Sequence, residues 1–271
     1  MGIVNVTPDS FSEPGAYLSV EAACNHAHEL IEQGADIIDV GGESTRPGAK
    51  PLSLEEELAR VIPVIQGLRK QTDIAISIDT YKPEVMQAAV AAGANLINDI
   101  YALRQKGALA MAAKLAVPVV LMHMQAEPET MQDNPSYPEG VLADIVRFWQ
   151  ERILACAEAG IEAENIILDP GFGFGKTVND NMQILQQWKD LQRFPQPLLL
   201  GVSRKSTIGK IINQPVENRM VGGIALTVCA AMQGLQIIRT HDVDETNQAL
   251  QMLEAVYSAK IKNKAESYES A

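Results

Sequence analysis

Polar side chains follow eight short apolar runs of this 271-residue sequence, at the point where each run ends. In chain order they are Asn5, Asp39, Asp79, Asn98, His123, Asp169, Ser203-Arg204-Lys205 and Arg239-Thr240-His241. A single Asn or Asp in such a place is explained by a turn or a helix cap. Eight polar ends that converge in the fold would instead form a binding site.

Three of these residues, Asp79, Asn98 and Asp169, are hydrogen-bond acceptors. A carboxylate accepts two N–H groups at once, so it can bind a ring N–H together with an exocyclic amine. We therefore expect a flat heterocycle rich in donors, such as a 2-amino-4-oxo pterin ring. For Asp79 or Asp169 taken singly, a helix N-cap is the alternative.

Basic residues form a second group at the same ends, namely Arg46, Arg204, Lys205, Arg239 and His241. Cationic side chains beside helix N-termini bind anions. Because the chain as a whole is acidic, with a net charge of −12, a local cluster of cations indicates a diphosphate site. The alternative is a set of solvated rim charges paired with acids such as Asp242.

Two other motifs are weaker. The segment Gly171-Phe172-Gly173-Phe174-Gly175-Lys176-Thr177 ends like a nucleotide P-loop, but Pro170 stands where the first glycine is required. We expect its glycines to let the backbone approach a ligand, with Phe174 as an exposed aromatic wall. The four histidines lack the spacing of a metal cluster. Mg²⁺ bound with a diphosphate needs only one or two protein oxygens, and Asn5 could supply one.

The elements that must position these residues follow a regular pattern. Apolar runs begin near Ile3, Ile37, Ile76, Leu96, Val119, Ile166, Leu198 and Ile237, and a helix-like segment follows each run. The runs do not alternate with polar residues, as is typical of parallel strands covered on both faces. Eight such units predict a single (β/α)8 TIM barrel, in which the carboxyl ends of the strands meet at one mouth.

Helix boundaries are marked by caps and breakers. Ser53 with Glu56 fits a capping box, and Pro83 and Gly93 fit the two ends of a helix. The remaining helices are expected over residues 19–33, 108–115, 138–160, 179–191, 217–234 and 242–260. One domain is expected over residues 1–271, with a flexible tail at about 261–271.

Composition limits the partners. An acidic protein is repelled by nucleic acid and by anionic membranes, so we expect neither as a partner. Cys24, Cys156 and Cys229 form no CxxC pair, which indicates free thiols in a reducing cytosol. Since no apolar stretch is long enough to cross a bilayer, we expect a cytoplasmic protein.

Eight segments resemble the dihydropteroate synthase family closely. They are 2–12 (GIVNVTPDSFS), 39–48 (DVGGESTRPG), 77–80 (SIDT), 98–100 (NDI), 122–124 (MHM), 169–176 (DPGFGFGK), 203–206 (SRKS) and 239–242 (RTHD). They occur in the family's order and cover essentially the whole chain. One departure lies in the first loop, where Glu13-Pro14-Gly15 stands in place of the usual Asp-Gly-Gly. Proline stiffens that loop and removes a backbone donor.

The resemblance implies a role for each matching residue. Pterin contacts would come from Asp79, Asn98, Asp169 and Lys205, with Met122 and Gly201 lining the pocket. Thr45, Arg239 and His241 would contact the diphosphate, with Asn5 acting through Mg²⁺. Arg46, Pro47, Phe174 and Ser206 would form the p-aminobenzoate pocket and its loops, where sulfonamides compete in this family. The family has no covalent nucleophile.

The resemblance also implies an activity: condensation of a dihydropterin methyl diphosphate with p-aminobenzoate in folate biosynthesis, with release of pyrophosphate. The expected enzyme is a magnesium-dependent transferase that forms a homodimer through late helices. Two alternatives are a methyltetrahydrofolate–corrinoid methyltransferase, which needs no diphosphate site, and a non-catalytic pterin-binding barrel. Release of pyrophosphate without a corrinoid partner would separate the first from a synthase.

Overall fold

A computed structural model describes residues 1–6, 16–43, 51–126, 130–131 and 134–259. The described residues form eight strands. They are β1 (Gly2–Asn5), β2 (Ile37–Gly41), β3 (Ala75–Asp79), β4 (Leu96–Asp99), β5 (Val119–Met122), β6 (Ile166–Asp169), β7 (Leu199–Leu200) and β8 (Ile237–Ile238). All eight runs expected from the sequence are therefore strands.

The strands close into a barrel. Strands β1 to β6 pair in sequence order, each parallel to the next, and β7 pairs in parallel with β8. Two parallel bridges join these sheets, Leu168 with Leu198 and Gly2 with Thr240. The second bridge is supported by the N–H of Ile3, which donates to the Thr240 carbonyl at 3.1 Å. The predicted (β/α)8 barrel is confirmed.

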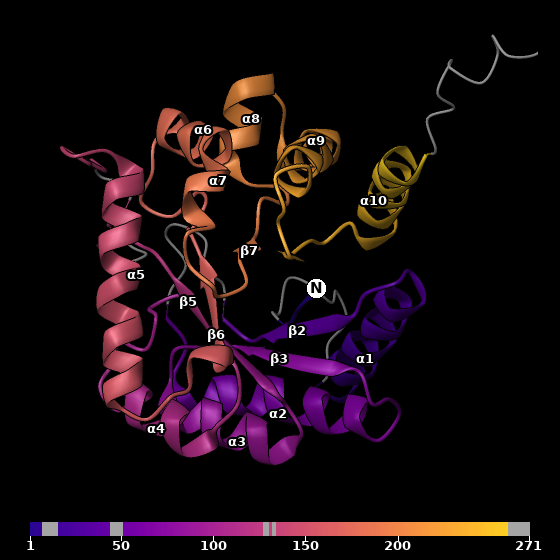
Figure 1. The fold of residues 1–271 in the computed structure, drawn as a ribbon. Coiled ribbons are helices and arrows are strands. Elements are labelled where there is room, and N and C mark those ends of the chain that lie inside the picture. The colour runs from indigo at the N-terminus through magenta and orange to yellow at the C-terminus, as the bar shows by residue number, and fades with distance from the viewer. Residues whose placement is uncertain (7–15, 44–50, 127–129, 132–133, 260–271) are drawn as a thin grey trace, which may run out of the picture.

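Helices surround the strands (Figure 1). They are α1 (Ala16–Glu32), α2 (Leu54–Arg69), α3 (Pro83–Ala92), α4 (Ala108–Leu115), α5 (Val141–Glu158), α6 (Val178–Gln186), α7 (Trp188–Leu191), α8 (Ser206–Ile212), α9 (Met220–Ala231) and α10 (Val243–Ser258). The Ser53–Glu56 capping box and the left-handed Gly93 at the end of α3 are both present. None of the described helices combines the length and the apolar character that a membrane span requires.

Three helix predictions were wrong in detail. Helix α5 begins at Val141 rather than at residue 138, because Gly140, at φ +91°, closes a turn onto the Tyr137 carbonyl. The helix expected over 179–191 is interrupted at Gln187, whose backbone is not helical. Helix α8 was missed, since only two turns separate its start from Asn213, which ends it in the left-handed conformation.

The barrel divides the core into an inner and an outer part. The inner cluster consists of Met1, Leu96, Val120, Ile167 and Leu199, with Ile37 and Ile237 packed against it. The larger outer cluster fills the space between strands and helices and includes the fully buried Trp149 and Trp188. Since alternate residues of each strand face inward, the packed interior leaves room for a site only at the mouth.

Candidate active site

An arginine from the last strand joins two carboxylates at the mouth. Arg239 donates from Nε to Asp39 Oδ2 at 2.6 Å and from Nη2 to Asp79 Oδ2 at 2.8 Å. Asn98 Nδ2 also donates to Asp39 Oδ2, at 3.1 Å. The strand register places Asp79 next to Asn98 on β3 and β4, and Asp39 lies on the adjacent β2, in register with Ser77. Three of the predicted residues therefore lie together.

Burial and neighbouring charges shift the pKa values of Asp79 and Arg239. Asp79 has its pKa raised to about 7, chiefly by burial and further by the charge of Asp39, while Arg239 lowers it. Burial lowers the pKa of Arg239, but Asp39 and Asp79 outweigh it, and the net shift is upward. The arginine therefore stays charged, and its charge opposes the effect of burial on Asp79.

Asp169 and Lys205 form the second charged pair of the mouth. Asp169 is buried, and its Oδ1 accepts the Gly171 N–H at 2.7 Å. Burial raises the pKa of Asp169, and the positive charge of Lys205 opposes that shift. Lys205 Nζ donates to the Phe172 carbonyl and lies 4.4 Å from the centre of the Phe174 ring. Burial lowers the pKa of Lys205 to about 8, against the attraction of Asp169.

The loop after β6 turns through three left-handed glycines. Gly171, Gly173 and Gly175 all have positive φ, at +66°, +85° and +59°. A Cβ on Gly171 would lie 1.9 Å from the His123 carbonyl oxygen, and one on Gly173 would lie 2.9 Å from Lys205 Cδ. These glycines thus admit the close approach of neighbouring protein groups. Phe174 is half-buried, not fully exposed, and packs against an apolar cluster that includes Met122.

A cavity of about 460 Å³ lies beside β1 and α1. Its lining includes Asn5 and His241, the residues expected at the diphosphate side, together with Asn25, His26 and Glu29. His241 Nδ1 lies 3.0 Å from Ser203 Oγ, which also accepts the His241 backbone N–H at 3.2 Å. Ser203 therefore fixes the orientation of this imidazole.

The remaining predicted residues divide into two sets. Met122 is buried at the end of β5, in register with Asp169. Gly201 lies against Arg239. Ser206 is exposed at the start of α8. Arg204 is a rim charge paired with Asp242, so for it the alternative interpretation holds. Thr45, Arg46, Pro47, the Glu13–Pro14 departure and the tail from residue 260 lie outside the described residues.

Sequence reasoning did not assign roles to Asp39 and Lys176. Asp39 is fully buried and receives both Arg239 and Asn98. Lys176 is 3% exposed, and its Nζ donates to three backbone carbonyls. Asp39 was recognised as a polar residue at the end of a predicted strand. No sequence pattern identified the cation that it pairs with, which is Arg239. Lys176 was considered only as the end of a P-loop-like motif.

The fold and this mouth together define a class of protein: a β/α barrel enzyme whose strand ends carry buried acids and cations for a polar, anionic ligand. Residues 1–241 match the pterin binding enzyme family. The dihydropteroate synthase of Escherichia coli K12 is 50% identical over 260 residues, covering 96% of this chain and 92% of that protein.

Solved structures agree with this match. A Yersinia pestis dihydropteroate synthase, in complex with a sulfonamide drug, superposes with a TM-score of 0.91 at 49% identity, covering 96% of this chain and 94% of its own. The Xanthomonas albilineans enzyme with 4-aminobenzoic acid gives 0.90 at 50% identity, over 96% and 93%. Another structure of the Xanthomonas enzyme contains 7,8-dihydropteroate. The chain therefore belongs to the pterin binding enzyme family, among the dihydropteroate synthases. It is accordingly a transferase of folate biosynthesis.

The coupling within the arginine–carboxylate cluster can be measured. Replacing Arg239 by Gln should raise the pKa of Asp79 further above about 7, because the charge that opposes burial is lost. Replacing Asp39 by Asn should lower the pKa of Asp79, because a neighbouring negative charge is removed. Carboxyl ¹³C NMR would follow both changes, with an Asp79→Asn spectrum to assign the signal.

The assignment matters because burial also raises the pKa of Asp99 to about 7. Asp36→Asn is the matched control, since Asp36 is exposed just before β2, away from the mouth. If both test variants moved the pKa of Asp79 in the same direction, the described pairing would be wrong.

Proposed function

We propose that this chain condenses (7,8-dihydropterin-6-yl)methyl diphosphate with p-aminobenzoate to give 7,8-dihydropteroate and pyrophosphate. The observation that carries the proposal is the proximity of Asp79 and Asp169 to Arg239 and Lys205 within one barrel mouth. Acids that bind the donors of a ring lie beside cations suited to its anionic tail.

The ring would be bound by Asp79, Asn98 and Asp169, with Lys205 as a fourth contact and Met122 and Gly201 as lining. The support is that Asp169 is buried and the Asp79 side chain is only 13% exposed, so a ring N–H that pairs with either carboxylate is largely shielded from water. For Asp79, such a contact would replace the one it now accepts from Arg239.

Substitution would take place at the pterin methylene carbon. The bond from that carbon to the diphosphate oxygen breaks first or nearly first, and its electron pair leaves with pyrophosphate. The resulting cation is delocalised into the pterin ring, the arylamine nitrogen supplies the electron pair of the new C–N bond, and the amine then loses a proton. The protein would contribute positioning and charge stabilisation, not a covalent nucleophile. Asp79 and Asp169 would favour the electron-deficient ring, and Arg239, Thr45 and His241 would bind the departing diphosphate.

The p-aminobenzoate would lie beside Phe174 and Ser206, with Arg46 and Pro47 completing its pocket. Support comes from the half-buried Phe174 ring next to Lys205 and from the Xanthomonas relative that binds 4-aminobenzoic acid. The sulfonamide complex of the Yersinia relative favours the same pocket as a drug site.

Mg²⁺ would assist the departure of the diphosphate by neutralising its developing charge. The donor set fits that ion: Asn5 offers an amide oxygen at the end of β1, in the cavity that His241 also lines. Mg²⁺ keeps several waters and takes the rest of its ligands from phosphate, so one protein oxygen is sufficient. Among the described residues no group of three or more His, Cys, Asp or Glu side chains could hold a metal ion.

A homodimer through the late helices is the second part of the proposal. Val221 and Met232 on and after α9 are 73% and 56% exposed, and Met252, Val256 and Tyr257 on α10 are exposed as well. Helices α9 and α10 pack against each other, so the two helices that carry these exposed residues are neighbours around the barrel (Figure 1). Exposed apolar side chains in such number favour association.

The principal test is release of pyrophosphate from the pterin diphosphate, with and without p-aminobenzoate. We expect Asp169→Asn and Lys205→Ala each to lower turnover at least about a hundredfold, because each removes a charge proposed to contact the reacting ring. The midpoint of thermal unfolding should stay nearly unchanged. Lys210→Ala is the control, since Lys210 is exposed on the neighbouring α8.

Turnover at the wild-type level in either variant would refute the assignment of that residue. Binding of the pterin diphosphate without any turnover would instead favour the non-catalytic barrel, and a requirement for a corrinoid would favour the methyltransferase.

Magnesium dependence gives a separate prediction. Asn5→Ala should raise the Mg²⁺ concentration needed for half-maximal turnover by at least about tenfold, because a protein ligand is lost. Asn25→Ala is a matched control from the same cavity. Full turnover after chelation of divalent ions would exclude the metal from the reaction.

The dimer is tested by sedimentation velocity. Val221→Asp should shift the protein from dimer to monomer, because a charge would be buried at the proposed contact. Leu154→Asp, at an apolar position on α5 that is 60% exposed, should leave the dimer intact. A wild-type protein that sediments as a monomer at micromolar concentration would contradict the proposal.

A further inference from the structure

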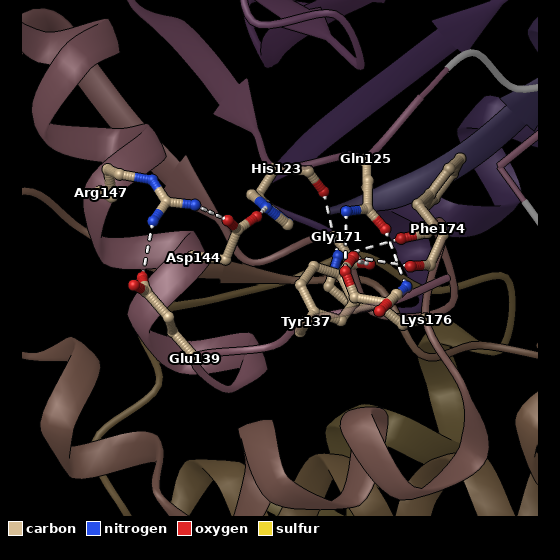
Figure 2. Close-up of polar contacts among 11 residues, drawn as sticks. His123, Gln125, Tyr137, Glu139, Asp144, Arg147, Gly171, Phe174 and Lys176 are labelled. Atoms are coloured by element: carbon tan, nitrogen blue, oxygen red, sulfur yellow. Dashed lines mark hydrogen bonds and ion pairs between the residues drawn. The ribbon is translucent and has the colours of Figure 1, made fainter. Parts of the chain in front are cut away.

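Lys176 is buried without an anionic partner. Only 3% of the residue is exposed, and none of the ion pairs among the described residues includes it. Its Nζ donates to the carbonyl oxygens of His123 at 3.2 Å, Gly171 at 3.0 Å and Phe174 at 3.0 Å (Figure 2). An ammonium has three donors, so all of them are used on the backbone.

These three carbonyls belong to two different loops. His123 follows β5, whereas Gly171 and Phe174 lie in the loop after β6. Backbone pairing already brings the loops together at their base, where the His123 N–H donates to the Asp169 carbonyl at 2.9 Å. Lys176 extends this contact beyond the ends of the strands, from residue 171 to residue 174.

Glycines make the close approach of the two loops possible. A Cβ on Gly171 would meet the His123 carbonyl oxygen at 1.9 Å and Lys176 Nζ at 3.3 Å, and one on Gly175 would meet the Gln125 carbonyl oxygen at 2.8 Å. Positive φ at both glycines turns their carbonyls as this packing requires. The glycines and Lys176 together therefore hold residues 171–175 against the loop after β5.

The same segment holds the substrate-side groups of the mouth. The Phe172 carbonyl accepts from Lys205 Nζ, and the Phe174 ring lies under that ammonium at 4.4 Å. Phe174 is thus fixed by Lys176 through its carbonyl and faces Lys205 through its ring. A shift of this segment would move both groups relative to Asp169, which remains on β6.

The network continues to the surface on the other side. His123 Nε2 lies 3.0 Å from Asp144 Oδ2, and Asp144 pairs with Arg147 on the same helix, α5 (Figure 2). Tyr137 adds a bond from its hydroxyl to the Gly175 carbonyl at 2.6 Å. The loop after β5 is therefore itself held against α5 through His123 and Asp144. Lys176 thus binds the loop after β6 to a segment whose position is already fixed.

We infer that Lys176 is a positioning residue: by tying the β6 loop to the β5 loop it sets the place of the Phe174 ring beside the bound p-aminobenzoate. The inference rests on the proposed function for the identity of that substrate. Direct contact between Lys176 and substrate is not part of it, because the three donors of the ammonium are already bonded to carbonyls. A displacement of about 1 Å is enough to lower a rate substantially.

The test compares Lys176→Met, which keeps the length of the side chain and removes the donors, with Lys176→Gln, which keeps two donors without the charge. Lys189→Met is the control, since Lys189 is exposed on α7. In Lys176→Met we expect KM for p-aminobenzoate to rise at least about tenfold, because the Phe174 wall is no longer fixed. KM for the pterin diphosphate should change less than about threefold, since the strands still hold Asp79 and Asn98. Lys176→Gln should raise KM for p-aminobenzoate less than Lys176→Met does, because glutamine keeps two of the hydrogen-bond donors.

Hydrogen exchange gives a readout that needs no activity. In Lys176→Met, backbone amides of residues 123–126 and 171–176 should exchange faster than in the wild type. Amides of β1 to β4 should exchange at the wild-type rate, because only the two loops separate. Unchanged exchange in the two loops, or an unchanged KM for p-aminobenzoate, would overturn the inference. So would an equal rise of both KM values with faster exchange throughout the barrel, which indicates a purely structural role. If Lys176→Met does not fold, the same criteria apply to Lys176→Gln.

The two proposals fail in distinguishable ways. A wild-type protein that releases no pyrophosphate would refute the proposed function, while the exchange measurement would still decide whether Lys176 holds the two loops together. An active wild-type protein with an unaffected Lys176→Met variant would refute only the role of Lys176.

Discussion

Burial of opposite charges beside one another at the barrel mouth is the interaction on which the rest of the site depends. Arg239 is separated by 200 residues from Asp39 and by 160 from Asp79, yet it donates to both. Leaving either carboxylate buried alone would cost several kcal/mol. The pairing is available only because the Gly2–Thr240 bridge brings the end of β8 next to β1. Closure of the barrel and formation of the charged cluster are therefore the same structural event.

The two sides of the mouth are built by different means. On the side of β2 to β4, regular strand register places Asp79 and Asn98, so their positions follow from backbone pairing alone. On the side of β6 and β7, Phe174 and Lys205 lie beyond the strand ends, and their positions depend on loop contacts. Loops lack the repeated hydrogen bonds that fix a strand, which explains why the second side needs left-handed glycines and a buried lysine.

Sequence reasoning recovered the part of the molecule that follows from periodicity. Buried parallel strands are continuous apolar runs, so the eight strands and the convergence of Asp79, Asp169, Lys205 and Arg239 could be predicted before any coordinates. The choice of partner within the mouth could not, because it depends on distances between residues far apart in the chain. The sequence placed Arg239 on the diphosphate side but did not reveal that it also bonds directly to Asp79. Likewise, the glycines after β6 marked a close approach but did not reveal that the approaching group was the His123 carbonyl.

The arrangement also determines what a ligand must replace. Asp79 shares its Oδ2 with Arg239, so a ring that binds this carboxylate exchanges one hydrogen bond for another, and the net gain is modest. Arg239 retains its second contact, the 2.6 Å bond from Nε to Asp39, through that exchange. Asp39, buried and also bonded to Asn98, therefore acts as a permanent support that keeps the arginine charged and in place. An arginine held in this way can turn its other donors toward an anion without leaving a carboxylate unpaired, since the ring then occupies Asp79.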